Sequence, residues 1–275
     1  MEQNVEVIRL DQICNNNCSF CFVQDKLANN YQPPLDDIIN EIESFKKDSI
    51  IDIFGGEPTT YKYFFPLMDY LHKNNKNVTL ATNLTKFSDE KFIEKFMKYE
   101  NVSMIRTTLL GKNDETHDYY TRTKGSFDKT IKAFKNFNEF INKKDLICVN
   151  TVMLPKNINQ LSDMFFILRS LGIERFKYGT PKGDFLNNEH ISHIKDMRPN
   201  ILKVASYIIN EKCEIKIEKS SVCMAPELIE HYLPAKPGMF YDECKRCKFF
   251  NKCDGFSKLY FKIYNDGFLY NDYCF

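Results

Sequence analysis

The sequence predicts an α/β fold built around a mainly parallel sheet. Short apolar segments with strand character alternate with longer segments whose apolar residues recur at helical spacing, and turn-forming residues separate them. This alternation favours parallel strands joined through helices. The six predicted strands are 5–10, 49–54, 77–84, 102–110, 146–154 and 175–180.

Helices are predicted between these strands. The first begins near Pro33 and Pro34, where Asp36 and Asp37 place negative charge in the first helical turn. The later predicted helices are 60–73, 88–99, 127–142, 158–171 and 196–211. A further strand at 214–218 is expected to close the core.

The character of the chain changes near residue 221. Residues 1–220 contain all the predicted α/β units, and we expect them to form one core domain. Residues 221–275 contain five of the ten cysteines and are expected to form a small cysteine-rich extension. Asn265-Asp266-Gly267 lies at the centre of 260–270, which predicts a β-hairpin there.

Charge and composition exclude several classes of protein. The 38 basic and 37 acidic residues give a net charge of +1, so we expect neither a nucleic acid nor a membrane surface as a partner. The sequence shows neither a signal peptide nor a stretch of about 20 apolar residues, and we expect a soluble, cytoplasmic protein. In a reducing compartment, clustered cysteines indicate metal ligation rather than disulfides.

Three cysteines lie close together after the first predicted strand. Cys14, Cys18 and Cys21 are separated by three and then two residues, and Phe20 directly precedes the last of them. An iron–sulfur cube takes one ligand per iron, so three thiolates would leave the fourth iron open to a small molecule. The alternatives are a zinc knuckle that lacks one ligand and three unrelated buried thiols.

The cysteine spacing resembles the signature of the radical S-adenosylmethionine (radical SAM) enzymes. Gly55-Gly56-Glu57-Pro58, at the end of the second predicted strand, resembles the methionine-binding motif of the same family. The resemblance covers approximately residues 5–180 and a second motif region near the C terminus. It implies an incomplete TIM-like barrel of six β/α units, in agreement with the number of predicted strands.

The resemblance also implies the chemistry. Cys14, Cys18 and Cys21 would hold a [4Fe–4S] cluster whose open iron binds S-adenosylmethionine. An electron from a donor such as ferredoxin or flavodoxin would cleave the cosubstrate, and the resulting 5′-deoxyadenosyl radical would abstract a hydrogen atom from the substrate. The protein would bind and orient these groups and exclude water. No catalytic acid or base is assigned.

Further residues are implied as contacts of S-adenosylmethionine. Phe20 would flank the adenine, and the backbone around Gly55, Gly56, Glu57 and Pro58 would face the methionyl ammonium. The other implied contacts are Thr82 and Asn83 at the third strand, Thr108 on the fourth, Asn150 on the fifth, and Arg122. Leu110 replaces an aspartate found in many members near His117-Asp118. Ordinary strand ends and a strand-to-helix turn remain the alternatives.

The C-terminal cysteines resemble the SPASM or twitch extensions of the family. Cys244, Cys247 and Cys253 match the central spacing, and Gly255 follows them. Ser257 lies where a full SPASM domain would have another cysteine, so one auxiliary [4Fe–4S] cluster is expected rather than two. The fourth ligand would be Cys223 or Cys274, and Cys223 is preferred because Cys274 lies at a terminus. A four-cysteine zinc site is the alternative.

The sequence indicates the substrate only through the resemblance. Members with such extensions often modify peptides by crosslinking or epimerisation, so a peptide substrate is the first expectation. Only 13 residues precede Cys14, so a leader peptide would need a separate binding protein or would dock directly. The alternatives are dehydrogenation or rearrangement of a small molecule, such as a sugar or a cofactor precursor, and a non-catalytic iron–sulfur or zinc protein that binds partners or carries electrons.

Overall fold

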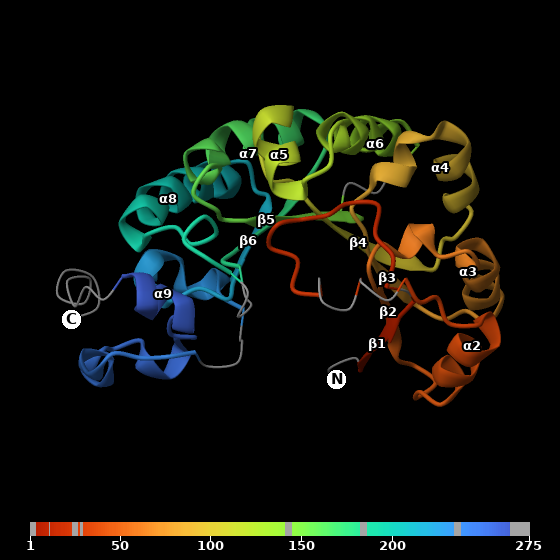
Figure 1. The fold of residues 1–275 in the computed structure, drawn as a ribbon, viewed down its shortest axis with the longest axis horizontal. Helices are drawn as coiled ribbons and strands as arrows, with labels where there is room; N and C mark the ends of the chain where they lie inside the picture. Colours follow the sequence, from red (N-terminus) through yellow and green to blue (C-terminus); the bar gives the residue numbers. More distant parts are fainter. Residues whose placement is uncertain are drawn as a thin grey trace.

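The computed structural model places a curved sheet inside a row of helices (Figure 1). It describes residues 4–10, 12–23, 27, 30–140, 145–181, 186–233 and 238–264. Within these ranges, none of the helices combines the length and the apolar character needed to cross a bilayer.

Seven parallel strands form the sheet, in the same order as in the sequence. The sheet is open, because β1 and β7 are its two edges and no described pairing joins them. The predicted parallel α/β fold and incomplete barrel are confirmed. The strand at 214–218 forms but does not close the sheet, since it pairs with β6 as a seventh parallel strand. The strands are β1 (Val5–Arg9), β2 (Ile50–Phe54), β3 (Val78–Ala81), β4 (Val102–Thr108), β5 (Ile147–Val152), β6 (Arg175–Gly179) and β7 (Glu214–Glu218).

The helices cover the convex face of the sheet (Figure 1). All the predicted helices form, although several are shorter than predicted at one end; α3, for example, begins at Phe64 after a short 3-10 turn. Helix α5 was not predicted, because its eight residues are mostly polar and carry no apolar stripe, and neither was α9. The helices are α2 (Leu35–Glu43), α3 (Phe64–Lys73), α4 (Glu90–Phe96), α5 (Asp114–Thr121), α6 (Ser126–Phe140), α7 (Leu161–Ser170), α8 (Ile194–Asn210) and α9 (Lys258–Ile263).

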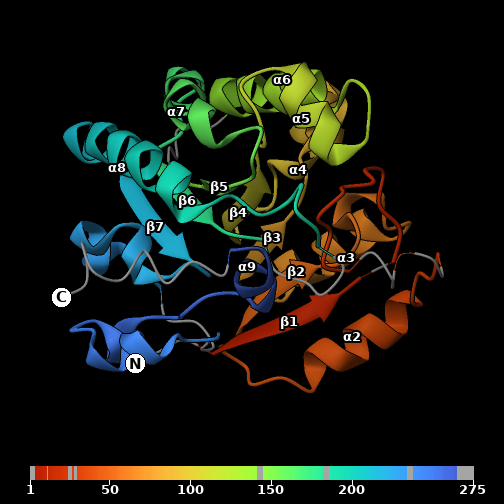
Figure 2. The same cartoon turned by 60° about the vertical axis from the view of Figure 1, so that its left-hand side comes forward.

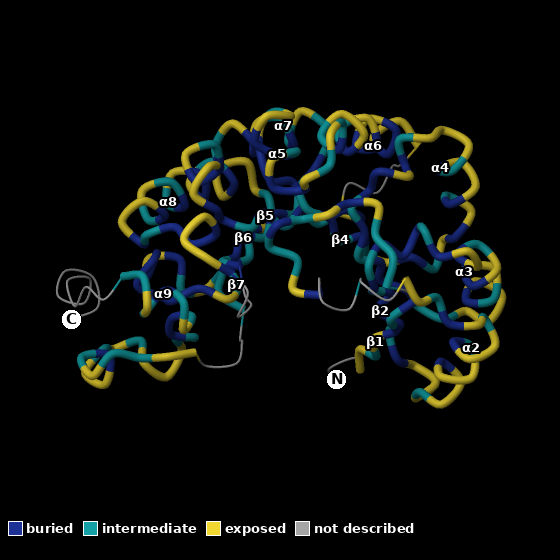
Figure 3. Tube along the Cα trace, viewed as in Figure 1, coloured by how far each residue is buried: buried dark blue, intermediate teal, exposed yellow. Residues whose placement is uncertain are grey.

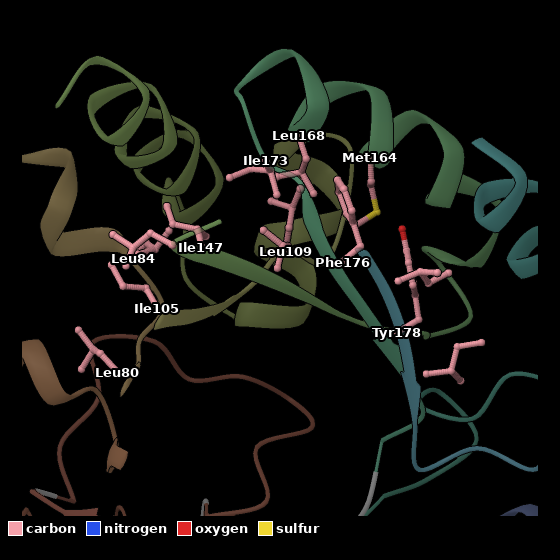
Figure 4. Packing of buried hydrophobic residues seen from close by; sticks show 14 of the residues in the cluster. Leu80, Leu84, Ile105, Leu109, Ile147, Met164, Leu168, Ile173, Phe176 and Tyr178 are labelled. Atoms are coloured by element: carbon pink, nitrogen blue, oxygen red, sulfur yellow. The ribbon is translucent and has the colours of Figure 1, made fainter. Parts of the chain in front are cut away.

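The hydrophobic core lies between the sheet and these helices. Alternate strand residues point toward the helices and are buried, among them Leu80, Ile105 and Phe176 (Figure 4). The buried positions form a continuous layer beneath the helices, and the exposed positions lie on the outer helical surface (Figure 3). This packing fixes which strand residues face the opposite, concave side.

The concave face of the sheet is polar. Asp52 on β2 accepts a hydrogen bond from Thr79 Oγ1 at 2.7 Å and forms an ion pair with Arg106 on β4. Farther along the sheet, Arg175 pairs with Glu214 at 2.7 Å, and two lysine ammonium groups flank Glu218. Removing charged side chains from water costs free energy, so these pairs keep this face of the sheet polar. The concave face therefore remains a polar surface on which a site can be built.

The chain after β7 forms short 3-10 turns that return to the sheet edge (Figure 2). Tyr232 bridges to Ile217 on β7, and Met239 pairs with Phe256. The predicted hairpin at 260–270 is wrong in its first arm, because Lys258–Ile263 form helix α9. Ser257 caps this helix by accepting a hydrogen bond from Tyr260 N. Residues 265–270 lie outside the described residues.

The aromatic packing beneath α4 and α6 predicts a large effect of one substitution. The ring of Phe87 is fully buried, with its centroid 4.8 Å from that of Phe96 and 5.0 Å from that of Phe137. We expect Phe87→Ala to lower the free energy of unfolding by about 3–5 kcal/mol, because it leaves a cavity. Urea unfolding followed by circular dichroism measures this. Phe140→Ala is the control, because that ring is 41% exposed; an equal loss in both variants would contradict the packing.

Candidate functional site

The three N-terminal cysteines lie on one loop that follows β1. Cys21 N donates a hydrogen bond to Cys18 O at 3.2 Å, and Asn16 N donates to Cys14 Sγ at 3.4 Å. Burial and the neighbouring Cys14 and Cys21 thiols raise the pKa of Cys18, while the charge of Arg122 lowers it. The three thiols are therefore close enough to influence one another. Metal binding would deprotonate them despite this burial.

The N-terminal cysteine group offers the donors that an iron–sulfur cluster uses. In the described ranges, no three His, Cys, Asp or Glu side chains surround a point where one metal ion could bind. A four-iron cube makes a different demand, since each thiolate binds its own iron and the sulfur atoms need not converge on one point. The donors present, three thiols and a backbone N–H directed at Cys14 Sγ, are those that such clusters use.

The cysteine loop rests on the C-terminal end of α5. Asn17 N donates to Thr121 O at 3.0 Å and Ser19 N donates to Tyr120 O at 2.8 Å, so the last carbonyls of the helix bind the loop. The Phe20 ring meets the Tyr120 ring edge-on, with centroids 6.4 Å apart. Arg122 follows with a left-handed φ of 49°, which ends the helix beside the cysteines.

The double glycine after β2 packs directly on the start of this loop. Glu57 N donates to Ile13 O at 2.7 Å, one residue before Cys14. A Cβ atom at Gly56 would lie 2.1 Å from Ile13 O, a separation that no side chain tolerates. Gly56 is thus required by the close approach of two backbones. The predicted motif and the cysteine loop meet at this point.

The carboxylate of Glu57 joins the ends of β2 and β3. It is 1% exposed and accepts hydrogen bonds from Thr59 N and Oγ1, from Thr82 Oγ1 at 2.6 Å, and from Asn83 N at 2.6 Å. Burial raises the pKa of Glu57, although each donor acts in the opposite direction. Both carboxylate oxygens are occupied by the chain itself. The side chains of Glu57 and Thr82 therefore act as structural ties in this conformation.

Asn83 extends this tie to the cysteine loop. Its Nδ2 donates to Asn15 Oδ1 at 2.7 Å, and Asn15 Nδ2 donates to Thr85 Oγ1 at 2.7 Å. Asn83 Oδ1 accepts from Thr85, and Asn83 Nδ2 lies 4.0 Å from Cys14 Sγ. Sequence reasoning missed Asn15, because an asparagine between two cysteines gives no local signal of a contact 68 residues away.

Thr108 and Asn150 are neighbours on the concave face. They are paired residues of β4 and β5, and both are half-buried. Asn150 Oδ1 is buried without a hydrogen-bond partner among the described residues. An orphaned acceptor of this kind suits a ligand hydroxyl or ammonium. The structure thus places two of the predicted contacts side by side.

His117 and Asp118 serve the fold rather than a ligand. His117 Nδ1 accepts a hydrogen bond from Leu110 N at 3.2 Å, and burial lowers the pKa of His117 to about 4. Asp118 caps α6 by accepting from Gly125 N, Ser126 Oγ and Phe127 N. Leu110, at the position of the missing aspartate, packs with buried Tyr120 and Leu154, and Phe20 borders this cluster.

Comparison with known proteins decides the family. The sequence model of the Radical SAM superfamily matches residues 10–168, which is more than half of the chain. The chain belongs to the radical SAM superfamily. The prediction of a radical SAM enzyme is confirmed at the level of the superfamily.

Two curated relatives are similar to the radical SAM region of the chain. The AdoMet-dependent heme synthase of Methanosarcina barkeri is 28% identical over 168 residues, covering 58% of this chain and 45% of the relative. The subtilosin biosynthesis protein AlbA of Bacillus subtilis is 28% identical over 174 residues, covering 60% of this chain and 36% of the relative. The chain spans less than half the length of each.

A solved structure shares the fold. Streptococcus suis SuiB bound to the precursor peptide SuiA matches with a TM-score of 0.64 at 21% identity, over 81% of this chain and 50% of SuiB. At this identity the likeness shows the fold alone. It agrees with the open parallel sheet of this radical SAM chain.

The C-terminal cysteines of this radical SAM chain form a second group. Cys253 Sγ accepts hydrogen bonds from Val222 N at 3.3 Å and from Gly255 N at 3.4 Å. Cys247 Sγ accepts one from Phe249 N at 3.4 Å. Backbone N–H groups directed at sulfur are typical of the surroundings of cluster ligands.

Cys223 lies with this group. It is 5% exposed and adjoins Val222, whose N–H reaches Cys253. After burial, the nearby Cys253 and Cys223 thiols are among the causes that raise the pKa of Tyr232. Cys274, the other candidate for the fourth ligand, lies outside the described residues. Among the described cysteines, Cys223 therefore lies near Cys253.

The buried carboxylate tie predicts an effect on stability. We expect Glu57→Gln to lower the free energy of unfolding by about 2–3 kcal/mol, because an amide nitrogen would face a backbone or hydroxyl donor. Denaturant unfolding of the cluster-free protein measures this without any contribution from cofactors. Glu94→Gln, at an exposed position of α4, is the matched control and should change little. Equal effects of the two substitutions would contradict the tie.

The buried, neutral His117 predicts that the free energy of unfolding depends on pH. Its pKa falls from 6.5 to about 4 on folding, so the unfolded chain takes up the proton first as the pH drops. Stability is fully retained above pH 6.5 and should fall by about 2 kcal/mol by about pH 5. Unfolding measured across this range tests it. His117→Gln should flatten the slope to what other groups such as His190 contribute. An unchanged slope in a folded His117→Gln variant would contradict the prediction.

Proposed function

We propose that this chain cleaves S-adenosylmethionine reductively and uses the resulting radical to abstract a hydrogen atom from its substrate. The observation that supports this best is the convergence of the cysteine loop, the Gly56 turn and the ends of β2 and β3 at one place. Parallel α/β folds bind their ligands at this carboxyl end of the strands. Membership of the radical SAM superfamily supplies the reaction class.

In this proposal, Cys14, Cys18 and Cys21 hold a [4Fe–4S] cluster. When bound, the cluster would supply the electron that cleaves S-adenosylmethionine. The chain holds the loop in place through Ile13 O, Asn15 and the carbonyls of α5. Arg122, exposed beside Cys18, offers its guanidinium to a carboxylate, which an arginine can bind through two parallel hydrogen bonds.

The adenosine half would lie against Phe20, whose ring is backed by the buried cluster of Leu110, Tyr120 and Leu154. An aromatic ring of this kind suits a flat base. The half-buried Thr108 and the orphaned Asn150 Oδ1 provide polar contacts for ribose or methionine groups. The backbone of Gly55-Gly56 and of Pro58 and Asn83 would complete the methionine site. Glu57 and Thr82 would support it indirectly, since their side chains bind each other.

We place an auxiliary [4Fe–4S] cluster in the C-terminal unit, with residues 1–220 as the core domain and 221–275 as the extension. Cys244, Cys247 and Cys253 would be its ligands, together with Cys223. The backbone N–H groups that reach Cys247 and Cys253 support this assignment. Cys274 is the alternative fourth ligand.

The substrate we favour is a peptide. AlbA is a protein of bacteriocin biosynthesis, and the SuiB structure contains a precursor peptide. The similarity to a heme synthase supports the alternative of a small cofactor precursor. An electron donor such as ferredoxin or flavodoxin, and a separate protein that binds a leader peptide, are the partners that this chemistry would use.

The activity is tested with the anaerobically reconstituted protein, dithionite and S-adenosylmethionine. We expect 5′-deoxyadenosine, measured by chromatography and mass spectrometry, and its loss in Cys18→Ala. Cys213→Ala is the matched control, because Cys213 lies outside both cysteine groups, before β7, and should not affect the activity. If wild-type protein with a full iron content yields no 5′-deoxyadenosine, a non-catalytic iron–sulfur role replaces the proposal.

Iron content tests the two clusters separately. We expect about eight irons per chain from two cubes, and about four after Cys244→Ala combined with Cys247→Ala. Iron and zinc are measured on the same sample. An iron content unchanged by the double substitution would exclude the auxiliary cluster, and one zinc per chain that disappears in the variant would show a zinc site instead.

A further inference from the structure

The strand register aligns four polar residues across the concave face of the sheet. Thr108 on β4 is paired with Asn150 on β5. Asn150 is paired with Lys177 on β6, and Lys177 with Lys216 on β7. Residues paired across neighbouring strands point to the same face of a sheet. We call Lys177 and Lys216 the lysine pair. The row therefore leads from two proposed contacts of S-adenosylmethionine directly to two cations.

The lysine pair faces the side of the sheet on which the cysteine loop lies. Tyr178 and Ile217, which each follow one of the two lysines, are buried beneath the helices, so strand alternation directs the lysine side chains the opposite way. The cysteine loop lies on this concave side (Figure 1). Neighbouring strands are about 4.8 Å apart, so the backbone of Lys216 lies about 10 Å from that of Asn150. A substrate that reaches the cysteine loop from this side would pass the lysine pair.

The two carboxylates of β7 are already paired with other cations. Glu214 Oε2 lies 2.7 Å from Arg175 Nε. The carboxylate of Glu218 lies 3.2 Å from the ammonium groups of both Lys177 and Lys219. The side chains of Lys177 and Glu218 are each only 17% exposed, so salt screens this pair weakly. The carboxylates of β7 therefore serve three cations before Lys216 is counted.

Lys216 is a half-buried cation without a counter-charge. It lies between Glu214 and Glu218 along β7, and no described residue forms an ion pair with it. Its partner across the strands is Lys177, and like charges directly opposite each other destabilise a sheet. An anion bound between the two ammonium groups would relieve this repulsion. The charge excess and the register together point to an anionic ligand.

We propose that the lysine pair binds a substrate carboxylate, and that this carboxylate is the side chain of an acidic residue in a peptide. The choice of a peptide rests on the proposed function. A carboxylate accepts charge-assisted hydrogen bonds from two ammonium groups at once. The methionyl carboxylate has a separate cation in Arg122, so S-adenosylmethionine does not need the lysine pair. Binding requires no cleavage of S-adenosylmethionine, and its failure is therefore distinguishable from failure of the proposed activity.

The test uses two acetylated and amidated tripeptides, Gly-Glu-Gly and Gly-Gln-Gly, which differ only by a carboxylate and its amide. The full-length, anaerobically reconstituted protein is titrated with each by isothermal calorimetry, with no reductant present. We expect the glutamyl peptide to bind about tenfold more tightly or better, because the amide makes no charge-assisted hydrogen bonds with the ammonium groups. The same preference is expected when S-adenosylmethionine is present at saturation.

Lys216→Gln should reduce the preference for the glutamyl peptide about fivefold or more, because one of the two ammonium groups is lost. This lysine is chosen because its removal breaks no described ion pair. Lys216→Arg keeps the charge and should retain most of the preference. Lys203→Gln, at an exposed position of α8, is the matched control and should leave the preference unchanged. Circular dichroism and iron content show whether each variant is folded and loaded.

Four results would overturn the proposal. The first is that the glutamyl peptide binds wild-type protein no more tightly than the glutaminyl peptide does. The second is that the preference survives in folded Lys216→Gln. The third is that S-adenosylmethionine abolishes binding of the glutamyl peptide, which would assign the lysine pair to the cosubstrate. The fourth is that propionate, the acidic side chain alone, binds as tightly as the peptide, which would indicate a small acid instead.

Discussion

The junction around the buried Glu57 carboxylate is the interaction on which the candidate site depends. It joins the end of β2 to the end of β3 through Thr82 and Asn83, and the adjacent backbone holds the cysteine loop at Ile13. A buried carboxylate is tolerated only where donors compensate for its lost hydration, and here four donors do so. The hydrogen bonds of the Glu57 carboxylate are therefore all made within the chain, and the site forms on them without a ligand.

A second support comes from α5. Its final carbonyls bind the cysteine loop, its Tyr120 ring contacts Phe20, and Arg122 follows its last turn. The orientation of this short helix is set by His117 toward β4 and by Asp118 toward α6. In the sequence, the residues from Thr108 to Arg122 resemble a set of ligand contacts. Two of them, His117 and Asp118, instead position the helix that supports the site.

Much of the fold could be predicted from the sequence, because parallel strands buried beneath helices leave strong apolar patterns. The strands and most helices lie where the patterns place them, and the double glycine lies beside the cysteine loop as its position after β2 suggests. The roles of Glu57 and Asn15 could not be predicted, because they depend on partners far away in the sequence. Asp118 gave no signal of capping, because α6, which it caps, begins eight residues after it. The first arm of the predicted hairpin at 260–270 forms a helix instead, whose N terminus Ser257 caps.

The open edges of the sheet have a consequence for the two cysteine groups. One group follows β1 and the other follows β7, the two strands that no described pairing connects. No described hydrogen bond joins β1 to β7. The curvature of the five strands between them therefore sets the distance between the two cysteine groups. With both proposed clusters bound, electron tunnelling between them would depend on that curvature, and substitutions in the middle of the sheet would alter electron exchange without touching any ligand.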